Sequence, residues 1–355
     1  MDQPTDLQKT FSYLVVTFGA YEFIFAFIDL FLNSFHVFIL SRRHMRTSSM
    51  NSILLGIAIV DMVFPVIAIK KQVRTWIFGS GVCTAPEGFI ETNVDWILYT
   101  IRDDFRRCST WLGLSLAAVR TVSVRNTMNQ KFSFVSRSRF GRQLVFSVIA
   151  FSSFFSVFYY LRFGIQNNGT QWTPPQGCNQ YEPGFSVPIY EFKEQELYTF
   201  SNGAFRKIYY IVVGTLAKFL PCFLFPLFTI MLIRELTKAK VARKAAKQDD
   251  KKDLTTRLVI YMTVSFFVIE FPIGICFFVE ATANTFNSGS VATSIIQLLN
   301  MVYVVMTLTH FFICFFMSSQ YRRTVKNTFS RGKQKTSASF VSVIQNARSE
   351  TSAFH

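Results

Sequence analysis

Long apolar runs alternate with short charged segments along this chain. Each run extends over 20–30 mainly apolar residues, enough for an α-helix to cross the hydrocarbon core of a bilayer. A soluble domain of this size would interrupt such runs with charged residues, because its surface helices face water on one side. The pattern predicts an all-α membrane protein with a bundle of seven transmembrane helices. The predicted spans are Phe11–Leu40, Met50–Lys70, Asp95–Val124, Gln143–Arg162, Ile208–Ile233, Leu258–Ala281 and Val291–Met317.

The composition supports a membrane location. The chain is 50% hydrophobic and its mean hydropathy is +0.29. It contains 42 phenylalanines. A bilayer accepts these bulky apolar side chains on the outward faces of a bundle, where a water-facing surface would not.

The lysines and arginines predict the orientation. If the N-terminus lies outside the cell, the inner loops and the tail hold about 25 of the 37 basic residues, as the positive-inside rule requires. The sequence therefore predicts a multi-pass plasma-membrane protein with residues 1–10 extracellular. This topology also explains the net charge of +16, so no nucleic-acid partner is needed to account for it.

Two cysteines fall in predicted loops, and both loops lie on the outer, oxidising side. We therefore predict a disulfide between Cys83 and Cys178; two free thiols are the alternative. The one glycosylation sequon begins at Asn168 and also falls in an outer loop. The other cysteines lie inside predicted helices: Cys108, Cys222, Cys276 and Cys314.

The third predicted span carries charges toward both ends. Asp103, Asp104 and Arg107 belong to a cluster near its outer end, and Arg120 lies alone among apolar residues further along. Asp103 and Arg120 are 17 positions apart, which is roughly 25 Å on a helix and close to the thickness of a bilayer core. Charges at such depths are costly and usually functional. Asp103, Asp104 and Arg107 are candidate ligand-binding residues, and an internal Asp103–Arg107 pair at helical spacing is the alternative.

Other spans carry isolated charges. Lys218 is the only charged residue of the fifth apolar span, and Glu270 lies alone in the middle of the sixth, whose other charged residue, Glu280, is next to its end. We expect them to face the bundle interior and to pair with each other or with a ligand. Glu22, in the first span, is a further candidate for lining a pocket.

A polar core is predicted deeper in the bundle. Asp61 lies at the centre of the second span, where a carboxylate must be paired, protonated or bound to a cation. Asn33 and His310 lie in the first and last spans and are candidates to share water or a sodium ion with it. Pro65 predicts a kink in the second span.

The segments after the last span are polar. Tyr321, Val325 and Phe329 recur every four residues with basic residues between them, which predicts a short amphipathic helix over residues 318–330 that contacts membrane lipids. Residues 331–355 are rich in serine and threonine and are predicted to be disordered. The sequence contains no catalytic or cofactor-binding motif, so neither an enzyme nor a cofactor is expected. It also has no convincing internal repeat, which argues against a transporter.

Several of these residues resemble those of rhodopsin-like G-protein-coupled receptors: Asn33, Asp61, Arg120 closing the third span, and Pro272 in the sixth. The finer resemblance is to nematode serpentine receptor class W chemoreceptors, which are similar to FMRFamide-type neuropeptide receptors. It rests on the strings WLGLSLAAVRTVSVRNTM and THFFICFFMSSQYRR, supported by DDFRRCSTW. The resemblance covers about residues 11–329.

The chain departs from the wider receptor pattern at three places. Val119 stands where the acidic member of the acidic–Arg–Tyr triplet is usual, and Thr121 replaces the tyrosine. His310 opens the string HFFIC in place of Asn-Pro-x-x-Tyr. Glu270 replaces the aromatic residue that usually precedes the proline of the sixth span by two positions. Class W sequences are similar to this one in the first two departures, so these do not indicate an inactive receptor.

The resemblance implies a receptor whose agonist enters from outside and whose inner face meets a heterotrimeric G protein at Arg120, Thr121 and Arg257. Arrestin is a further candidate partner. The acidic groups near the outer end favour a cationic, FMRFamide-like neuropeptide whose arginine binds Asp103 or Asp104. A chemosensory receptor for a small external molecule is the alternative, and a transporter or channel is a more remote one.

Overall fold

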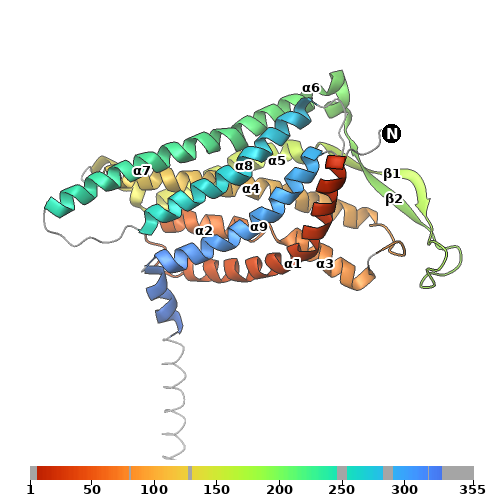
Figure 1. The fold of residues 1–355 in the computed structure, drawn as a ribbon, viewed down its shortest axis with the longest axis horizontal. Helices are drawn as coiled ribbons and strands as arrows, with labels where there is room; N and C mark the ends of the chain where they lie inside the picture. Colours follow the sequence, from red (N-terminus) through yellow and green to blue (C-terminus); the bar gives the residue numbers. More distant parts are fainter. Residues whose placement is uncertain are drawn as a thin grey trace, which may run out of the picture.

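Seven helical crossings dominate this computed structural model, which describes residues 6–79, 81–126, 130–245, 254–282, 291–318 and 320–329. Within these residues, six spans are long and apolar enough to cross a membrane, and α4 makes the seventh crossing. Figure 1 shows the helices arranged as one elongated bundle. The helical elements are α1 (Asp6–Leu40), α2 (Ser49–Asp61), α3 (Val66–Phe78), α4 (Phe89–Arg125), η1 (Gln130–Ser136), α5 (Ser138–Tyr160), α6 (Glu196–Val213), η2 (Gly214–Phe219), α7 (Leu220–Ala245), α8 (Leu254–Thr282) and α9 (Val291–Met317).

The most highly charged helix, α4, lies inside the bundle. It contacts α2, α5 and α7 along its length. A helix surrounded by other helices can hold charged side chains that pair with its neighbours, so it does not need a fully apolar surface toward lipid. The predicted seven-helix bundle is confirmed.

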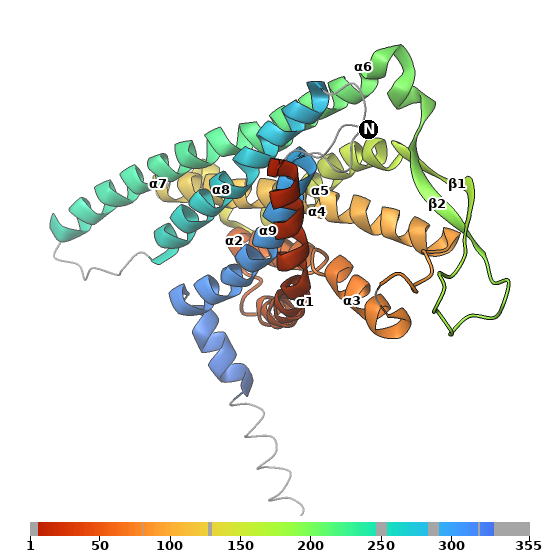
Figure 2. The ribbon, with the colours of Figure 1, turned by 45° about the vertical axis from the view of Figure 1, so that its right-hand side comes forward.

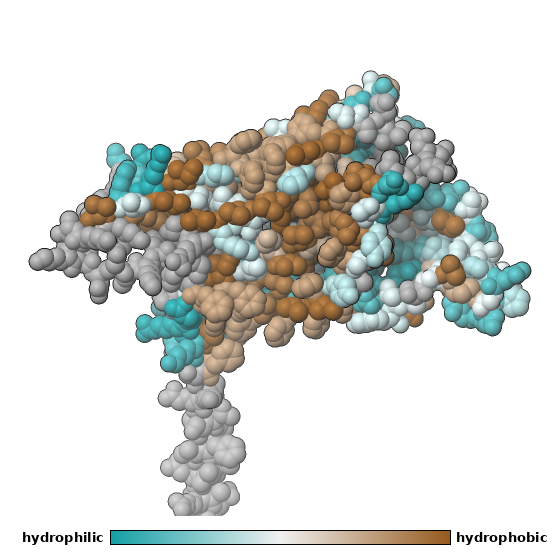
Figure 3. All heavy atoms as spheres, in the orientation of Figure 1, coloured by the Kyte–Doolittle hydropathy of each residue, from teal (hydrophilic) through white to brown (hydrophobic). Residues whose placement is uncertain are grey.

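An apolar belt surrounds the bundle. Figure 3 shows hydrophobic side chains across the middle of one face, with hydrophilic side chains gathered toward its ends. The β-hairpin lies at one end and the helix of residues 320–329 lies toward the other (Figures 1 and 2). We call these the hairpin end and the tail end.

The second span is broken, as Pro65 predicts. Residues 62–65 form turns between α2 and α3, and Pro65 precedes the first residue of α3. The helix then continues beyond the predicted boundary at Lys70, and α4 begins before the predicted Asp95. Polar residues in these extra turns pair across the two helices: Arg74 Nε lies 2.7 Å from Glu91 Oε1, and Lys70 binds Asp95. Apolar length alone therefore underestimated both helices.

A two-stranded sheet forms the hairpin end. β1 (Phe163–Trp172) pairs antiparallel with β2 (Val187–Glu194), and the register is interrupted between Asn167 and Gln171. A Cys83–Cys178 disulfide joins the α3–α4 connection to the segment between the two strands, which confirms the predicted pairing. Asn168 lies exposed on β1. Figure 2 shows the hairpin extending beyond the first turns of α4.

The two ends of the chain differ from their predicted boundaries. α1 begins at Asp6, so residues 6–10 are helical. Residues 320–329 are also helical. Tyr321 is buried there, and its hydroxyl lies 3.0 Å from His36 Nδ1. Residues 331–355 lie outside the described part of the chain, so their predicted disorder remains a prediction.

Candidate functional site

A cavity of about 370 Å³ lies in the hairpin-end half of the bundle. This volume is within the range of small-molecule binding sites. Every helical span except α1 contributes to its wall, together with both strands of the hairpin. The lining residues are Phe64, Trp96, Tyr99, Arg102, Asp103, Arg106, Tyr159, Arg162, Phe163, Phe192, Tyr210, Lys218, Ile273, Phe277, Glu280, Thr293, Ile296, Gln297 and Asn300.

Aromatic side chains close the cavity toward the hairpin. The Trp96 ring stacks on Tyr159 with centroids 5.2 Å apart. It packs edge-to-face with Phe163 at 5.2 Å and at a tilt with Phe192 at 5.4 Å. The Trp96 Nε1–H donates to the Tyr160 carbonyl oxygen at 3.0 Å, which fixes the indole. Because Phe163 and Phe192 belong to β1 and β2, the position of the hairpin sets the shape of this end of the cavity.

Two cationic side chains of the wall, Arg106 and Lys218, share a carboxylate that lies behind it. Arg106 Nε donates to Glu270 Oε1 at 2.8 Å, and Lys218 Nζ donates to Glu270 Oε2 at 2.7 Å. Arg106 also hydrogen-bonds Asn300 of α9. All three charged side chains are buried, Glu270 completely. We call Arg106, Lys218 and Glu270 the ion triad.

The backbone around Lys218 explains why this side chain reaches the interior. Lys218 lies in η2, a π-helical turn whose wider winding changes the direction of the side chains. Pro221 follows and lacks the N–H that a regular helix would donate to residue 217. Gly274 of α8 lies opposite, and a Cβ there would be only 3.1 Å from both the Lys218 Cβ and the Phe219 ring. The glycine therefore lets α8 approach η2 closely.

Sequence reasoning paired Lys218 with Glu270 but missed Arg106. The pairing is confirmed, although Glu270 binds two cations rather than one. Arg106 is one of three arginines in a short cluster, and its partner lies 164 positions away. A helical projection of the third span would have separated the arginines, because Arg102 and Arg106 share one face while Asp103 and Arg107 share another.

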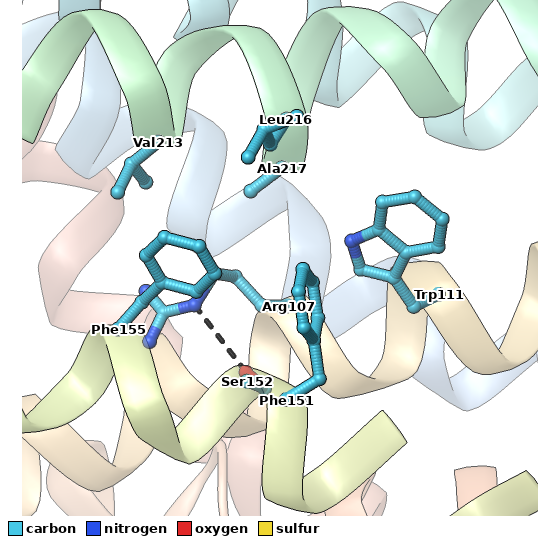
Figure 4. Close-up of a pocket in the computed structure, with 8 residues that line it drawn as sticks. All are labelled: Arg107, Trp111, Phe151, Ser152, Phe155, Val213, Leu216 and Ala217. Atoms are coloured by element: carbon cyan, nitrogen blue, oxygen red, sulfur yellow. Dashed lines mark hydrogen bonds between the residues drawn. The ribbon is translucent and has the colours of Figure 1, made fainter. Parts of the chain in front are cut away.

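Arg107 is held away from the ion triad. Figure 4 shows it between α5 on one side and the α6–η2 segment on the other, among aromatic and aliphatic side chains. Its Nε donates to Ser152 Oγ at 3.3 Å, its Nη2 donates to Ser156 Oγ at 2.5 Å, and its Nη1 binds Asp103. The small void beside it holds about 10 Å³, room for no more than a water molecule. Arg107 thus anchors α4 to α5.

The other predicted ligand-binding residues lie in different places. Asp103 lines the cavity, but its carboxylate forms the internal i,i+4 pair with Arg107 that was the alternative reading. Asp104 faces α5, where its Oδ2 accepts from Ser153 Oγ at 2.9 Å, and it is not part of the cavity wall. Glu22 is half-buried on α1 and also lies outside this wall.

A second ion network fixes the hairpin to the bundle. Arg162 follows α5, and its Nε donates to Glu194 Oε1 of β2 at 2.8 Å. Arg206 of α6 donates to Glu194 Oε2 at 3.1 Å. Arg162 also binds the hydroxyl of Tyr210, a cavity residue. The sequence analysis did not single out these residues, because loop charges give no signal of which helix they bind.

The predicted polar core is divided into two pairs. His310 Nδ1 lies 3.0 Å from Asp61 Oδ2, so these two residues meet as the sequence suggested. Asn33 instead donates from Nδ2 to Asp29 Oδ1 at 2.8 Å, one turn away on α1. Asp29 is therefore the closer partner of Asn33, as expected for residues four apart on one helix face.

The candidate residues for intracellular coupling lie at the tail end. Arg120 belongs to the last turns of α4, and its Nη1 lies 3.7 Å from the Met50 Sδ. The Thr121 hydroxyl contacts the Phe228 carbonyl oxygen of α7 at 3.3 Å and the Ala117 carbonyl oxygen at 2.8 Å. Arg257 lies in α8, and its side chain is outside the described part of the structure.

Comparison with known families identifies the architecture. The model of the serpentine-type seven-transmembrane GPCR chemoreceptor family Srw matches residues 20–332. The chain belongs to the Srw family. No curated protein matches it in a sequence search. As an Srw receptor it is a multi-pass membrane protein of a class that binds extracellular ligands and acts through G proteins. The resemblance carried by the third and last spans is thus confirmed.

Proposed function

We propose that this Srw receptor binds a small extracellular molecule in the hairpin-end cavity and activates a heterotrimeric G protein at its tail end. The observation that carries this proposal is the ion triad, two of whose members, Arg106 and Lys218, line the cavity. The triad connects α4, η2 and α8, so a ligand that binds one of its cations directly changes the contacts between these helices. A ligand shifts a conformational equilibrium only if it interacts differently with the two states, and a triad spanning three helices offers such a difference.

The orientation is part of the proposal. The hairpin end carries the Cys83–Cys178 disulfide and the sequon at Asn168, both of which suit the extracellular side. Basic residues concentrate at the tail end, as expected for the cytoplasmic side. We place the receptor in the plasma membrane with its N-terminus outside, and residues 318–330 on the inner leaflet in contact with lipid.

The size of the cavity supports a small ligand. A volume of about 370 Å³ fits a compact organic molecule. Trp96 and the hairpin residues Phe163 and Phe192 restrict the cavity on the outer side. A ligand bound below them would meet both aromatic and polar side chains of the wall.

A FMRFamide-like peptide is the second candidate, and the exposed hairpin favours it. β1 and β2 flank the aromatic end of the cavity and offer strand edges to an extended peptide. Its arginine would have to compete with Arg107 for Asp103, however, and Asp104 faces α5. Arginine recognition by these two carboxylates therefore requires rearrangement of α4 and its neighbours.

G-protein coupling is proposed at Arg120, Thr121 and Arg257, with arrestin as a further partner of the same face. Cells that carry a promiscuous G protein should release calcium when exposed to an active member of a panel of small odorants and amidated neuropeptides. We expect Arg120→Ala to abolish this response at unchanged surface level. Arg43→Ala, which removes an exposed arginine from the same end, is the matched control and should respond normally.

A response that survives in Arg120→Ala would contradict the proposed coupling site. Activation by amidated peptides alone would replace the small-molecule proposal with the peptide candidate.

A further inference from the structure

We infer that the ligand of this receptor is a small carboxylic acid whose carboxylate binds between Arg102 and Arg106 in the cavity. This inference rests on the proposed function, because it names the class of molecule that the same cavity takes. It follows from the way in which the charges of α4 are distributed around the helix.

The charged cluster of α4 occupies neighbouring faces of the helix, and only one of these faces presents arginines to the cavity. Arg102 and Arg106 are four residues apart, so they lie one above the other on one face, and both line the cavity. Asp103 and Arg107 form the neighbouring stripe and bind each other. A ligand in the cavity therefore meets two guanidinium groups on adjacent turns, whereas the nearest carboxylate of the helix is already engaged.

The ion triad leaves one positive charge without a matching carboxylate. Arg106 and Lys218 share Glu270, and the additional partner of Arg106 is the neutral Asn300. The Arg106 Nη2 is buried and has no hydrogen-bond partner. An unpaired buried charge is costly in a low-dielectric interior. An anion beside Arg106 would remove this cost.

Arg102 adds a second cation, and the nearby Glu22 of α1 acts on its charge without forming an ion pair with it. Its guanidinium lies over the rings of Tyr99 and Phe64, at 4.9 Å and 5.7 Å from their centroids. Among the residues that the structure describes, it forms no ion pair. Aromatic contacts hold the group in place and leave its hydrogen-bond donors available for a planar, bidentate partner such as a carboxylate.

The other charged residues of the wall do not neutralise Arg102 and Arg106. Arg162 binds Glu194, and Asp103 binds Arg107. Glu280 is a buried carboxylate in the part of the wall formed by α8, whereas Arg102 and Arg106 belong to α4. The wall carries Arg102, Arg106, Arg162 and Lys218 together with Asp103 and Glu280, and two carboxylates lie behind it: Glu194, bound to Arg162, and Glu270, bound to Arg106 and Lys218.

The cavity also restricts the net charge of the ligand and the polarity of its body. The single surplus charge of the triad suits a monoanion better than a phosphate, which carries about −1.5 to −2 at neutral pH. Aromatic and aliphatic groups make up much of the other wall, including Trp96, Ile273 and Phe277. A compact acid with an aromatic or aliphatic body is the ligand class that fits both features.

The first test compares acids with their uncharged amides. Cells expressing the receptor and a promiscuous G protein are exposed to benzoate, phenylacetate and 4-phenylbutyrate, to the matching amides, and to phenyl phosphate. We expect an acid to be at least about tenfold more potent than its amide, because charge-assisted hydrogen bonds are lost with the carboxylate. A phenylalanine-terminated peptide as free acid and as amide tests whether the carboxylate can come from a peptide.

Arg102→Gln is the decisive variant. It should weaken the response to acids by about tenfold or more and leave any response to amides unchanged. Lys71→Gln is the matched control, because Lys71 is exposed at the same end and lies outside the cavity wall. Arg102→Lys keeps the charge without the planar donor pair and should give an intermediate potency.

The second test does not depend on signalling. The melting temperature of the purified, detergent-solubilised receptor should rise with benzoate or phenylacetate but not with benzamide or with chloride at equal ionic strength, and Arg102→Gln should remove the rise. Stabilisation by carboxylates without any calcium response would retain the inference and reject the proposed signalling. Four outcomes would overturn the inference. Three concern signalling: a response to amides or amidated peptides alone, equal potency of acid and amide, or a preference for phenyl phosphate over the acids. The fourth is that no carboxylate stabilises the purified receptor.

Discussion

The two halves of the bundle hold their polar groups in different ways. In the hairpin-end half, full charges meet across helices, with Arg106 and Lys218 both bound to Glu270. In the tail-end half, Asp61 instead meets the imidazole of His310, whose charge depends on its protonation. Ion pairs in a low-dielectric interior are strong and depend on geometry. We therefore expect the loss of one charged partner to disturb the hairpin-end half more than the tail-end half.

The largest effect should come from Glu270→Gln. This change leaves two buried cations near each other without their carboxylate, and removing one partner of a buried pair costs about 3–5 kcal/mol. We expect a large fall in surface expression and in the melting temperature of the purified receptor. Lys218→Met should be much milder, because it leaves Arg106 and Glu270 as a balanced pair.

The double variant Lys218→Met with Glu270→Gln is the control for this asymmetry. It removes one cation together with the carboxylate, so it should recover part of the stability lost in Glu270→Gln alone. Equal damage from Glu270→Gln and Lys218→Met would show that the two cations do not share the carboxylate as the geometry indicates.

The sequence was sufficient for the features that depend on local composition. The spans follow from apolar length, the break in the second span follows from Pro65, and the Cys83–Cys178 disulfide follows from the location of both cysteines in outer loops. The predicted end of α3 came too early and the predicted start of α4 came too late. Polar turns such as the one carrying Glu91 resemble loop sequence when their partners on the neighbouring helix are unknown.

The composition of the candidate site depended on tertiary packing. Lys218 and Glu270 stood out because each is flanked by long apolar sequence, whereas Arg106 was hidden among neighbouring arginines. Asp104 was assigned to the ligand, but the rotation of α4 turns it toward Ser153 of α5. A charge can be located from sequence, but its partner depends on how the helices are rotated against one another.

Close helix contacts provide the second way to compare the two halves. Gly141 packs against the start of α2 at the tail end, and a Cβ there would lie 2.5 Å from the Ser49 carbonyl oxygen. Backbone atoms cannot move aside, so Gly141→Ala should separate α2 from α5 and cost about 1–3 kcal/mol or more. At the hairpin-end half, Gly274→Ala meets the Lys218 side chain and the Phe219 ring at 3.1 Å, and should cost less.

Melting temperatures of the two variants, measured beside Gly19→Ala, test this order. A Cβ at Gly19 would meet only the Met301 Cε at 3.6 Å, an ordinary contact, so this helical control should be neutral or slightly stabilising. Gly274→Ala should in addition alter the response to carboxylates, because it displaces Lys218, while Gly141→Ala should not change ligand selectivity. If Gly274→Ala proved more destabilising than Gly141→Ala, the hairpin-end half would be the more rigid of the two.

The smallest effect should come from Tyr321→Phe, which probes the link between the bundle and the helix of residues 320–329. The Tyr321 hydroxyl lies 3.0 Å from His36 Nδ1, and the ring also packs against Phe311. Removing the hydroxyl leaves the ring contacts in place and costs about 1 kcal/mol, the value of one buried hydrogen bond. Tyr13→Phe, on an exposed part of α1, should leave the melting temperature unchanged. A loss comparable to that of Glu270→Gln would mean that this single hydrogen bond, rather than the ion triad, controls the stability of the bundle.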